Sequence, residues 1–291
     1  MTKAIFCAAL ALCIFSLFPA AGGMADPVPV FVSILPQRYF LQKIGGARLQ
    51  VSVLVPPGAE YHTYEPKPTQ MAALSKARLY FAIGAPFEAA WLPRFTSVNP
   101  AMRIVHTDEG IERIPMETHD HHGEDNHPEG EQDPHTWLSP PNVKIMARNI
   151  AAALREADPA HRAEYDENGR RFIREIDELD AELRGIFAGS KGLRFMVFHP
   201  AWGYFARAYG LKQVPVEIEG KEPKPAQLKA LIEEARKGGI KVIFVQPQFS
   251  TRSAETIAKA IGGQVVLADP LHPDWAGNLR EQAARFKAAL K

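Results

Sequence analysis

A helical pattern runs almost without interruption from Asp158 to Ala188, and a helix of that length limits the folds open to this chain. Asp158 is a good N-cap residue, and Pro159 suits the first helical position. An apolar stripe follows with steps of four, three, four and three residues: Phe172, Ile176, Leu179, Leu183 and Ile186. About thirty helical residues span roughly 45 Å, which is longer than one lobe needs. We therefore predict that residues 159–189 form a rigid helix that crosses two lobes.

Apolar segments rich in β-branched residues alternate with helical segments on both sides of this helix. The first half contains four predicted strands: Val28 to Ile34, Leu49 to Val55, Leu79 to Ile83 and Arg103 to Val105. The second half contains four more: Arg194 to Phe198, Val214 to Glu217, Ile240 to Val245 and Gly263 to Leu267. Such alternation produces parallel βαβ units. The predicted fold is α/β, with two lobes, residues 26–158 and 190–291, each a roughly four-stranded parallel sheet flanked by helices.

The N-terminal segment is typical of an export signal. Lys3 precedes an apolar run from Ala4 to Ala21, and the small residues before Asp26 fit a signal peptidase site. We predict that residues 1–25 are a signal peptide cleaved after Ala25 and that the mature protein is periplasmic. An uncleaved membrane anchor is the alternative, because the run approaches the length of a short span.

Both cysteines, Cys7 and Cys13, lie within this segment. The mature chain therefore has no disulfide, and only nitrogen and oxygen atoms can bind a metal. Loss of Lys3 with the signal leaves basic and acidic residues in equal number. This balance gives no indication of nucleic-acid binding or of a charged membrane surface, and we predict a monomer.

A hydrophilic segment at residues 119–131 is unlike the rest of the chain. It contains no aliphatic or aromatic residue and four of the ten histidines: His119, His121, His122 and His127. We predict a mobile loop that binds zinc weakly, with a solvated linker as the alternative. His135 follows just beyond it, where Trp137 and Leu138 can pack.

Metal-capable side chains follow predicted strands in both lobes. His62 comes shortly after the second strand, His199 ends the strand from Arg194, and Asp269 follows the strand that ends at Leu267. Ligands of open parallel sheets bind at the carboxyl ends of the strands. Together with His135, these residues form a set of three histidines and one carboxylate that suits tetrahedral Zn²⁺.

Each candidate ligand also has a structural alternative. His62 and Asp269 can serve as turn residues, and His199 can be a buried residue at a helix start. Glu60 lies two residues before His62, where it can support that ligand, replace a ligand, or remain exposed. The remaining histidines outside the hydrophilic segment are expected to be structural or exposed: His106, His161 and His272.

Four short motifs carry a resemblance to a known family. They are PGAEYHTYEP at 57–66, DPHTWL at 133–138, FHPAW at 198–202 and DPL at 269–271. In this order, with the histidine-rich segment and the long helix, they resemble the ZnuA-like periplasmic solute-binding proteins of metal ABC transporters. The resemblance implies that His62, His135 and His199 are ligands and that Asp269 occupies the variable fourth position. Tyr61 and Ser139 depart from the family pattern, in which some relatives carry Glu and Asp.

The resemblance implies a protein that captures Zn²⁺ between two lobes and delivers it to the membrane permease of an ABC transporter, without catalysis. A histidine at 199, where manganese-binding relatives usually carry a carboxylate, favours zinc. One alternative is a secreted zinc-dependent hydrolase with Glu60 as general base, although the chain has no HExxH motif. Others are a manganese- or iron-binding member of the same family and a surface adhesin of the same fold.

Overall fold

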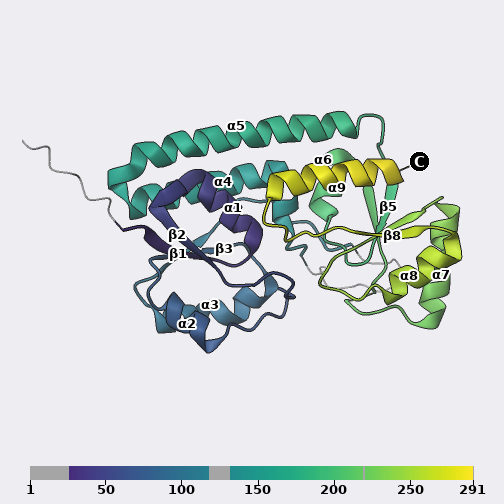
Figure 1. The fold of residues 1–291 in the computed structure, drawn as a ribbon, viewed down its shortest axis with the longest axis horizontal. Coiled ribbons are helices and arrows are strands. Elements are labelled where there is room, and N and C mark those ends of the chain that lie inside the picture. Colours follow the sequence, from purple (N-terminus) through teal and green to yellow (C-terminus); the bar gives the residue numbers. More distant parts are fainter. Residues whose placement is uncertain (1–25, 118–131, 219, 291) are drawn as a thin grey trace, which may run out of the picture.

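The computed structural model describes residues 26–117, 132–218 and 220–290, and Figure 1 shows two lobes side by side. The predicted signal peptide and the histidine-rich segment lie outside these residues and stay predictions. Within the described ranges, no helix is long and apolar enough to cross a membrane.

Each lobe is built on a four-stranded sheet. The first sheet has the order β2-β1-β3-β4, and the second has the order β6-β5-β7-β8. The strands are β1 (Val28–Val32), β2 (Leu49–Val53), β3 (Leu79–Ala82), β4 (Arg103–His106), β5 (Arg194–Val197), β6 (Lys212–Pro215), β7 (Val242–Val245) and β8 (Gln264–Leu267). All neighbouring strands pair in parallel, which confirms the predicted α/β class. The two sheets share one strand order, so their carboxyl ends present equivalent positions.

Helices cover the sheets. In the first lobe these are α1 (Leu35–Gly45), α2 (Pro68–Leu74), α3 (Pro86–Val98) and α4 (Pro140–Ala157). In the second they are α6 (Gly203–Tyr209), α7 (Pro225–Lys237), α8 (Arg252–Ile261) and α9 (Trp275–Ala289). Figure 1 shows α2 and α3 on the opposite side of the first sheet from α1 and α4. Both faces of the parallel sheet are therefore covered, as such sheets require.

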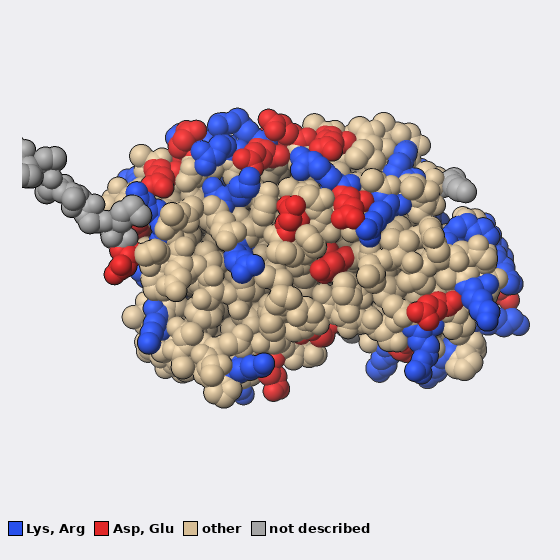
Figure 2. Space-filling model, in the orientation of Figure 1, with Lys and Arg blue, Asp and Glu red and all other residues tan. Residues whose placement is uncertain are grey.

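The long predicted helix is α5 (Arg162–Ile186), which runs along both lobes (Figure 1). A short 3-10 helix, η3 (Pro159–His161), precedes it, so the α-helix starts three residues later than predicted. Four residues of the predicted stripe are buried: Phe172, Ile176, Leu179 and Leu183. Figure 2 shows acidic and basic side chains interspersed along the outer surface of this helix. The apolar side of α5 thus faces the core as predicted.

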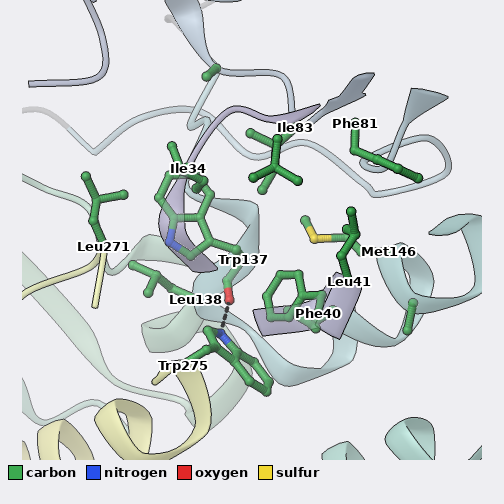
Figure 3. Packing of buried hydrophobic residues seen from close by; sticks show 14 of the residues in the cluster. Ile34, Phe40, Leu41, Phe81, Ile83, Trp137, Leu138, Met146, Leu271 and Trp275 are labelled. Carbon is green, nitrogen blue, oxygen red and sulfur yellow. Dashed lines mark hydrogen bonds between the residues drawn. The ribbon is translucent and has the colours of Figure 1, made fainter. Parts of the chain in front are cut away.

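A second connection between the lobes was not predicted. Trp275, the first residue of α9, packs against Phe40 of α1 with ring centroids 5.3 Å apart. Its indole nitrogen donates to the carbonyl of Trp137 at 2.7 Å (Figure 3). The indole of Trp137 in turn donates to the carbonyl of Pro270 at 2.8 Å. One hydrophobic core continues from the first sheet under α5 into one face of the second sheet. The division at residues 158 and 189 stays a prediction, and part of the core is continuous across it.

Candidate metal centre

Three histidines from distant parts of the chain meet between the lobes. His62 lies in the loop between β2 and α2, His135 immediately precedes the 3-10 helix η2 (Thr136–Leu138), and His199 follows β5. Their candidate ligand atoms all lie within 4.8 Å of one another. The Nε2 atoms of His135 and His199 are 3.2 Å apart. The structure therefore brings together the three histidines expected from the sequence.

A carboxylate holds the far ring nitrogen of each histidine. The Nδ1 atom of His135 is 2.7 Å from Oδ1 of Asp133, and that of His199 is 2.7 Å from Oε1 of Glu217. Nδ1 of His62 makes the same contact with Glu60. An Nδ1–H that donates to a carboxylate leaves a lone pair on Nε2, which is the tautomer a metal ion needs.

The first-lobe histidines share one local structure. In each, a carboxylate two residues upstream accepts from the ring and from the histidine's own backbone N–H. That backbone bond is 2.8 Å from His62 to Glu60 and 2.8 Å from His135 to Asp133. The acid-x-His spacing thus fixes both the turn and the ring direction.

The second-lobe histidine receives its carboxylate through the sheet. Strand β6 pairs with β5, and the backbone N–H of Glu217 donates to the carbonyl of Phe198 at 3.0 Å. Glu217 lies just past the end of β6, and this pairing places it beside His199. Adjacent parallel strands therefore supply the ligand and its support at one edge of the sheet.

Burial disfavours the protonated form of His135. His135 is completely buried, and burial together with the neighbouring His199 and His62 holds the pKa of its imidazole well below 6.5. Nε2 of His62 is buried and has no hydrogen-bond partner among the described residues. Two Nε2 lone pairs facing each other at 3.2 Å repel unless a cation lies between them. The arrangement is therefore suited to a cation.

The supporting carboxylates differ in their surroundings. Burial raises the pKa of Asp133 to about 7, although the backbone N–H of His135 opposes that rise. Burial also opposes the ionisation of Glu60, but its hydrogen bond to His62 prevails and lowers the pKa of this carboxyl. An ionised Glu60 offsets part of the charge of a divalent ion bound by neutral imidazoles.

Asp269 lies outside the cluster of three histidines found in the described part of the chain. Its Oδ1 atom accepts from the backbone N–H of Leu271 at 2.9 Å and from Gln248 at 3.2 Å. These bonds hold the carboxylate within the local turn that precedes α9. Ligation by Asp269 stays a prediction, as does weak binding by the four histidines at 119–127, which lie outside the described residues.

The other three histidines lie apart from this cluster. His106 and His272 are exposed, and the ring of His161 is 2.8 Å from Asp158. Two residues of the site went unrecognised in the sequence. Asp133 repeats the spacing of Glu60 to His62, so that signal was present. Glu217 has no such signal, because its position depends on the register between β5 and β6.

The family described as "Zinc-uptake complex component A periplasmic" matches residues 30–289. The high-affinity zinc uptake system protein ZnuA of Bacillus subtilis (strain 168) is 29% identical over 262 residues, covering 87% of this chain and 81% of that protein. The iron-binding protein YfeA of Yersinia pestis is 32% identical over 228 residues, covering 77% and 70%.

Solved structures give the same result. A structure described as the crystal structure of ZnuA superimposes with a TM-score of 0.84 and 43% sequence identity. The match covers 91% of this chain and 99% of that one. The similarity therefore extends over both lobes and the helix that joins them.

Proposed function

The chain belongs to the family of periplasmic zinc-uptake components of ABC transporters, and from that membership we propose that it captures Zn²⁺ between its lobes and delivers it to a membrane permease. The observation that carries this proposal is the convergence of three Nε2 atoms, each on a ring whose Nδ1 is held by a carboxylate. Zinc bound to nitrogen at about 2.0–2.1 Å in a tetrahedron separates its ligand atoms by roughly 3.3 Å. The 3.2 Å between His135 and His199 agrees with that spacing.

The donor set supports zinc over manganese as the cargo. Imidazole nitrogen suits zinc, whereas carboxylate and carbonyl oxygen suit manganese. All three clustered donors are imidazoles, and the nearest carboxylates are engaged with the outer ring nitrogens. The iron-binding relative shows that the fold alone does not select the metal.

We propose Asp269 as the fourth ligand, reached when its carboxylate leaves Gln248. Its backbone is already held, because the side chain of Asn278 donates to the Asp269 carbonyl at 2.8 Å. Asp269→Ala is expected to weaken zinc binding less than loss of a histidine does, because it removes one donor and leaves three clustered imidazoles. Equal losses would indicate that Asp269 supports the fold of the site instead.

No reaction is proposed. A hydrolase would need a general base within reach of a metal-bound water. Glu60, the candidate base, accepts from both the ring and the backbone of His62, and its role is therefore to orient this ligand.

We further propose export with cleavage after Ala25, action as a monomer, and a division into residues 26–158, 159–189 and 190–291.

The test is zinc competition against a chromophoric chelator. His62→Ala, His135→Ala and His199→Ala should each bind zinc much more weakly than the wild type, because each removes one of few donors. His106→Ala is the matched control, since this histidine is exposed and lies outside the cluster. Wild-type affinity in all three variants would overturn the site. Tighter binding of manganese or iron than of zinc would overturn the choice of cargo.

Delivery to a permease has a separate test in the native host. Deletion of the chain should impair growth when zinc is scarce, and the wild-type protein should restore it. His135→Ala, which removes one of the three clustered imidazoles, should not restore growth. Rescue by His135→Ala would show that the growth effect does not depend on this metal centre.

A further inference from the structure

We propose that Gln246 and Phe249, on the loop between β7 and α8, are the positioning residues that set the direction of His199. This inference rests on the proposed function and names the residues that prepare the second lobe's ligand. Neither residue is a metal ligand. They act through His199, and we call them the His199 clamp.

Gln246 binds the backbone of His199 on both sides. Its Oε1 atom accepts from the His199 N–H at 3.3 Å, and its Nε2 atom donates to the His199 carbonyl at 2.7 Å. The side chain is 1% exposed. A buried amide that makes two bonds to one residue fixes both peptide planes around it. The Cα–Cβ direction of His199 is thereby set before any metal arrives.

The sequence position of His199 makes this support necessary. The residue lies just past the end of β5, where the backbone leaves the hydrogen-bond ladder of the sheet. A buried N–H and C=O without partners would each cost about 1–3 kcal/mol. Gln246 accepts from the N–H and adds a second donor to the carbonyl, which also accepts from the backbone N–H of Ala201 at 2.8 Å, so both groups are satisfied although they are buried.

The sheet register brings the clamp to this position. Strand β7 pairs with β5, and the backbone N–H of Phe198 donates to the carbonyl of Phe244 at 2.7 Å. The residues just past the ends of the two strands therefore lie side by side. This is why Gln246 reaches His199 although they are 47 residues apart in the chain.

Phe249 covers the ring. Its centroid is 5.0 Å from that of His199, and the rings are nearly parallel, with an interplanar angle of 21°. Glu217 holds the ring edge at Nδ1. His199 is thus fixed at its backbone by Gln246, and its imidazole is fixed on one face by Phe249 and at one edge by Glu217. Its Nε2 atom faces His135. A ligand fixed in this way loses little conformational entropy on metal binding.

The test compares Gln246→Met with Asn99→Leu. Asn99 is also a buried amide that binds two backbone groups, the carbonyls of Leu74 and Ala77, at the opposite end of the first sheet from the histidines. Both variants lose comparable buried hydrogen bonds, so both lower stability. We expect zinc binding to weaken about 10- to 100-fold in Gln246→Met, the range found when a ligand's outer partner is lost, and to remain near wild type in Asn99→Leu.

A second readout separates ligand direction from stability. Co²⁺ bound in place of zinc has a visible absorption spectrum that reports the geometry of its ligands. We expect Gln246→Met to change the band shape and Asn99→Leu to preserve it. Wild-type affinity and spectrum in Gln246→Met would overturn the proposal, and equal losses in both variants would reduce Gln246 to a purely structural role.

Phe249→Leu keeps the proposal testable if Gln246→Met does not fold. Phe249 is half-buried, so its loss should leave the fold intact while removing the ring that covers His199. We expect weaker zinc binding and an altered Co²⁺ spectrum, and wild-type values for both would count against the clamp. If the wild type itself binds no zinc, the proposed function fails. If the wild type binds tightly and all variants match it, only this inference fails.

Discussion

A carboxylate at each ring nitrogen is the recurrent residue-scale feature of this site. Glu60, Asp133 and Glu217 come from three different segments, yet each accepts from Nδ1 of one histidine. Partners of this kind fix the ring orientation and raise the basicity of the ligand. The metal affinity of the site is therefore expected to depend on residues that never touch the ion.

Substitution of Glu217 tests this dependence. Glu217→Ala should weaken zinc binding about 10- to 100-fold, because His199 loses the acceptor for its Nδ1–H. Glu217→Gln should lose less, since an amide oxygen can still accept that proton. Chelator competition measures both, with the exposed Glu222→Ala as control. The role assigned to Glu217 would be refuted if Gln at this position were as damaging as Ala.

Residue patterns were sufficient to predict the histidines that cluster but not the residues that support them. His62 and His199 could be predicted because each follows a recognisable strand, and parallel strands collect their carboxyl ends at one edge. Gln246 and Glu217 could not, because nothing local in the sequence relates them to His199. Their contacts depend on which strands neighbour β5, and strand order is not encoded in periodicity.

At the scale of elements, the start of α3 contains a buried carboxylate. Glu88 accepts from the backbone N–H groups of Ile83, Gly84 and Ala85 at 2.8–3.2 Å. Ser33, just beyond β1, also donates to it. Glu88 therefore joins the ends of β1 and β3 to the first turn of α3.

This carboxylate predicts a pH dependence of stability. Burial raises the pKa of Glu88 from 4.5 to about 7, against the opposing hydrogen bonds from Ser33 and the backbone. Between these values the folded chain binds a proton that the unfolded chain has released. The contribution of Glu88 to the free energy of unfolding is therefore full below the unfolded pKa and declines by about 3 kcal/mol as pH rises through the folded pKa.

Glu88→Gln should remove that decline. Denaturant unfolding of wild type and variant between about pH 5 and pH 8 gives the difference in their free energies of unfolding at each pH. The wild type should lose stability relative to the variant as pH rises. Parallel pH profiles would show that Glu88 does not titrate in this range.

Two glycines in α5 should respond in opposite ways to substitution. A Cβ atom on Gly169 would lie 3.3 Å from Cβ of Ala151 in α4, whereas one on Gly185 would meet nothing within 4 Å. Gly185→Ala should stabilise the protein by roughly 0.5–1 kcal/mol, because alanine favours the helix. Gly169→Val should destabilise it by roughly 1–3 kcal/mol through overpacking. Thermal unfolding measures both, and destabilisation by Gly185→Ala would contradict the argument.

Element boundaries were predicted less well than element types. The sequence pattern predicts only a short helix here, from Phe87 to Trp91, whereas α3 continues to Val98. Pro93 lies inside this helix, and proline cannot donate to the carbonyl four residues earlier. The helix continues, and the hydroxyl of Ser97 donates to the Pro93 carbonyl at 2.9 Å. Packing of Phe95 in the core supports the helix beyond the point where the local pattern weakens.

At the scale of the molecule, one hydrophobic cluster is shared by both lobes, and a second cluster belongs to the C-terminal lobe alone. The amphipathic stripe of α5 predicted a spine, but the return of α9 to the first lobe could not be inferred from periodicity. Two indole hydrogen bonds connect the lobes at a seam between Trp137 and the start of α9. Trp275 donates to the carbonyl of Trp137, and Trp137 donates to the carbonyl of Pro270. Because Trp137 lies two residues after His135, the metal site and this seam form a continuous structure. We therefore expect both lobes to unfold together.

Zinc should stabilise the whole molecule for the same reason. The three histidines meet only in the native state, so an ion bound there stabilises the folded chain alone. With free zinc about 100-fold above its dissociation constant, the gain is about 2.7 kcal/mol, which corresponds to a rise in melting temperature of roughly 5–10 °C. Manganese should produce a smaller shift, because the clustered donors are imidazoles.

Calorimetry of wild type, His135→Ala and His106→Ala checks this prediction. His106→Ala should keep both the zinc-dependent shift and a single transition, since this exposed residue lies outside the cluster. His135→Ala should lose most of the shift, because it removes the buried donor that connects the first lobe to His199. A larger shift with manganese would contradict the choice of metal. A zinc-dependent shift of only one of two separate transitions would show that the ion stabilises one lobe and that the shared core does not couple the two.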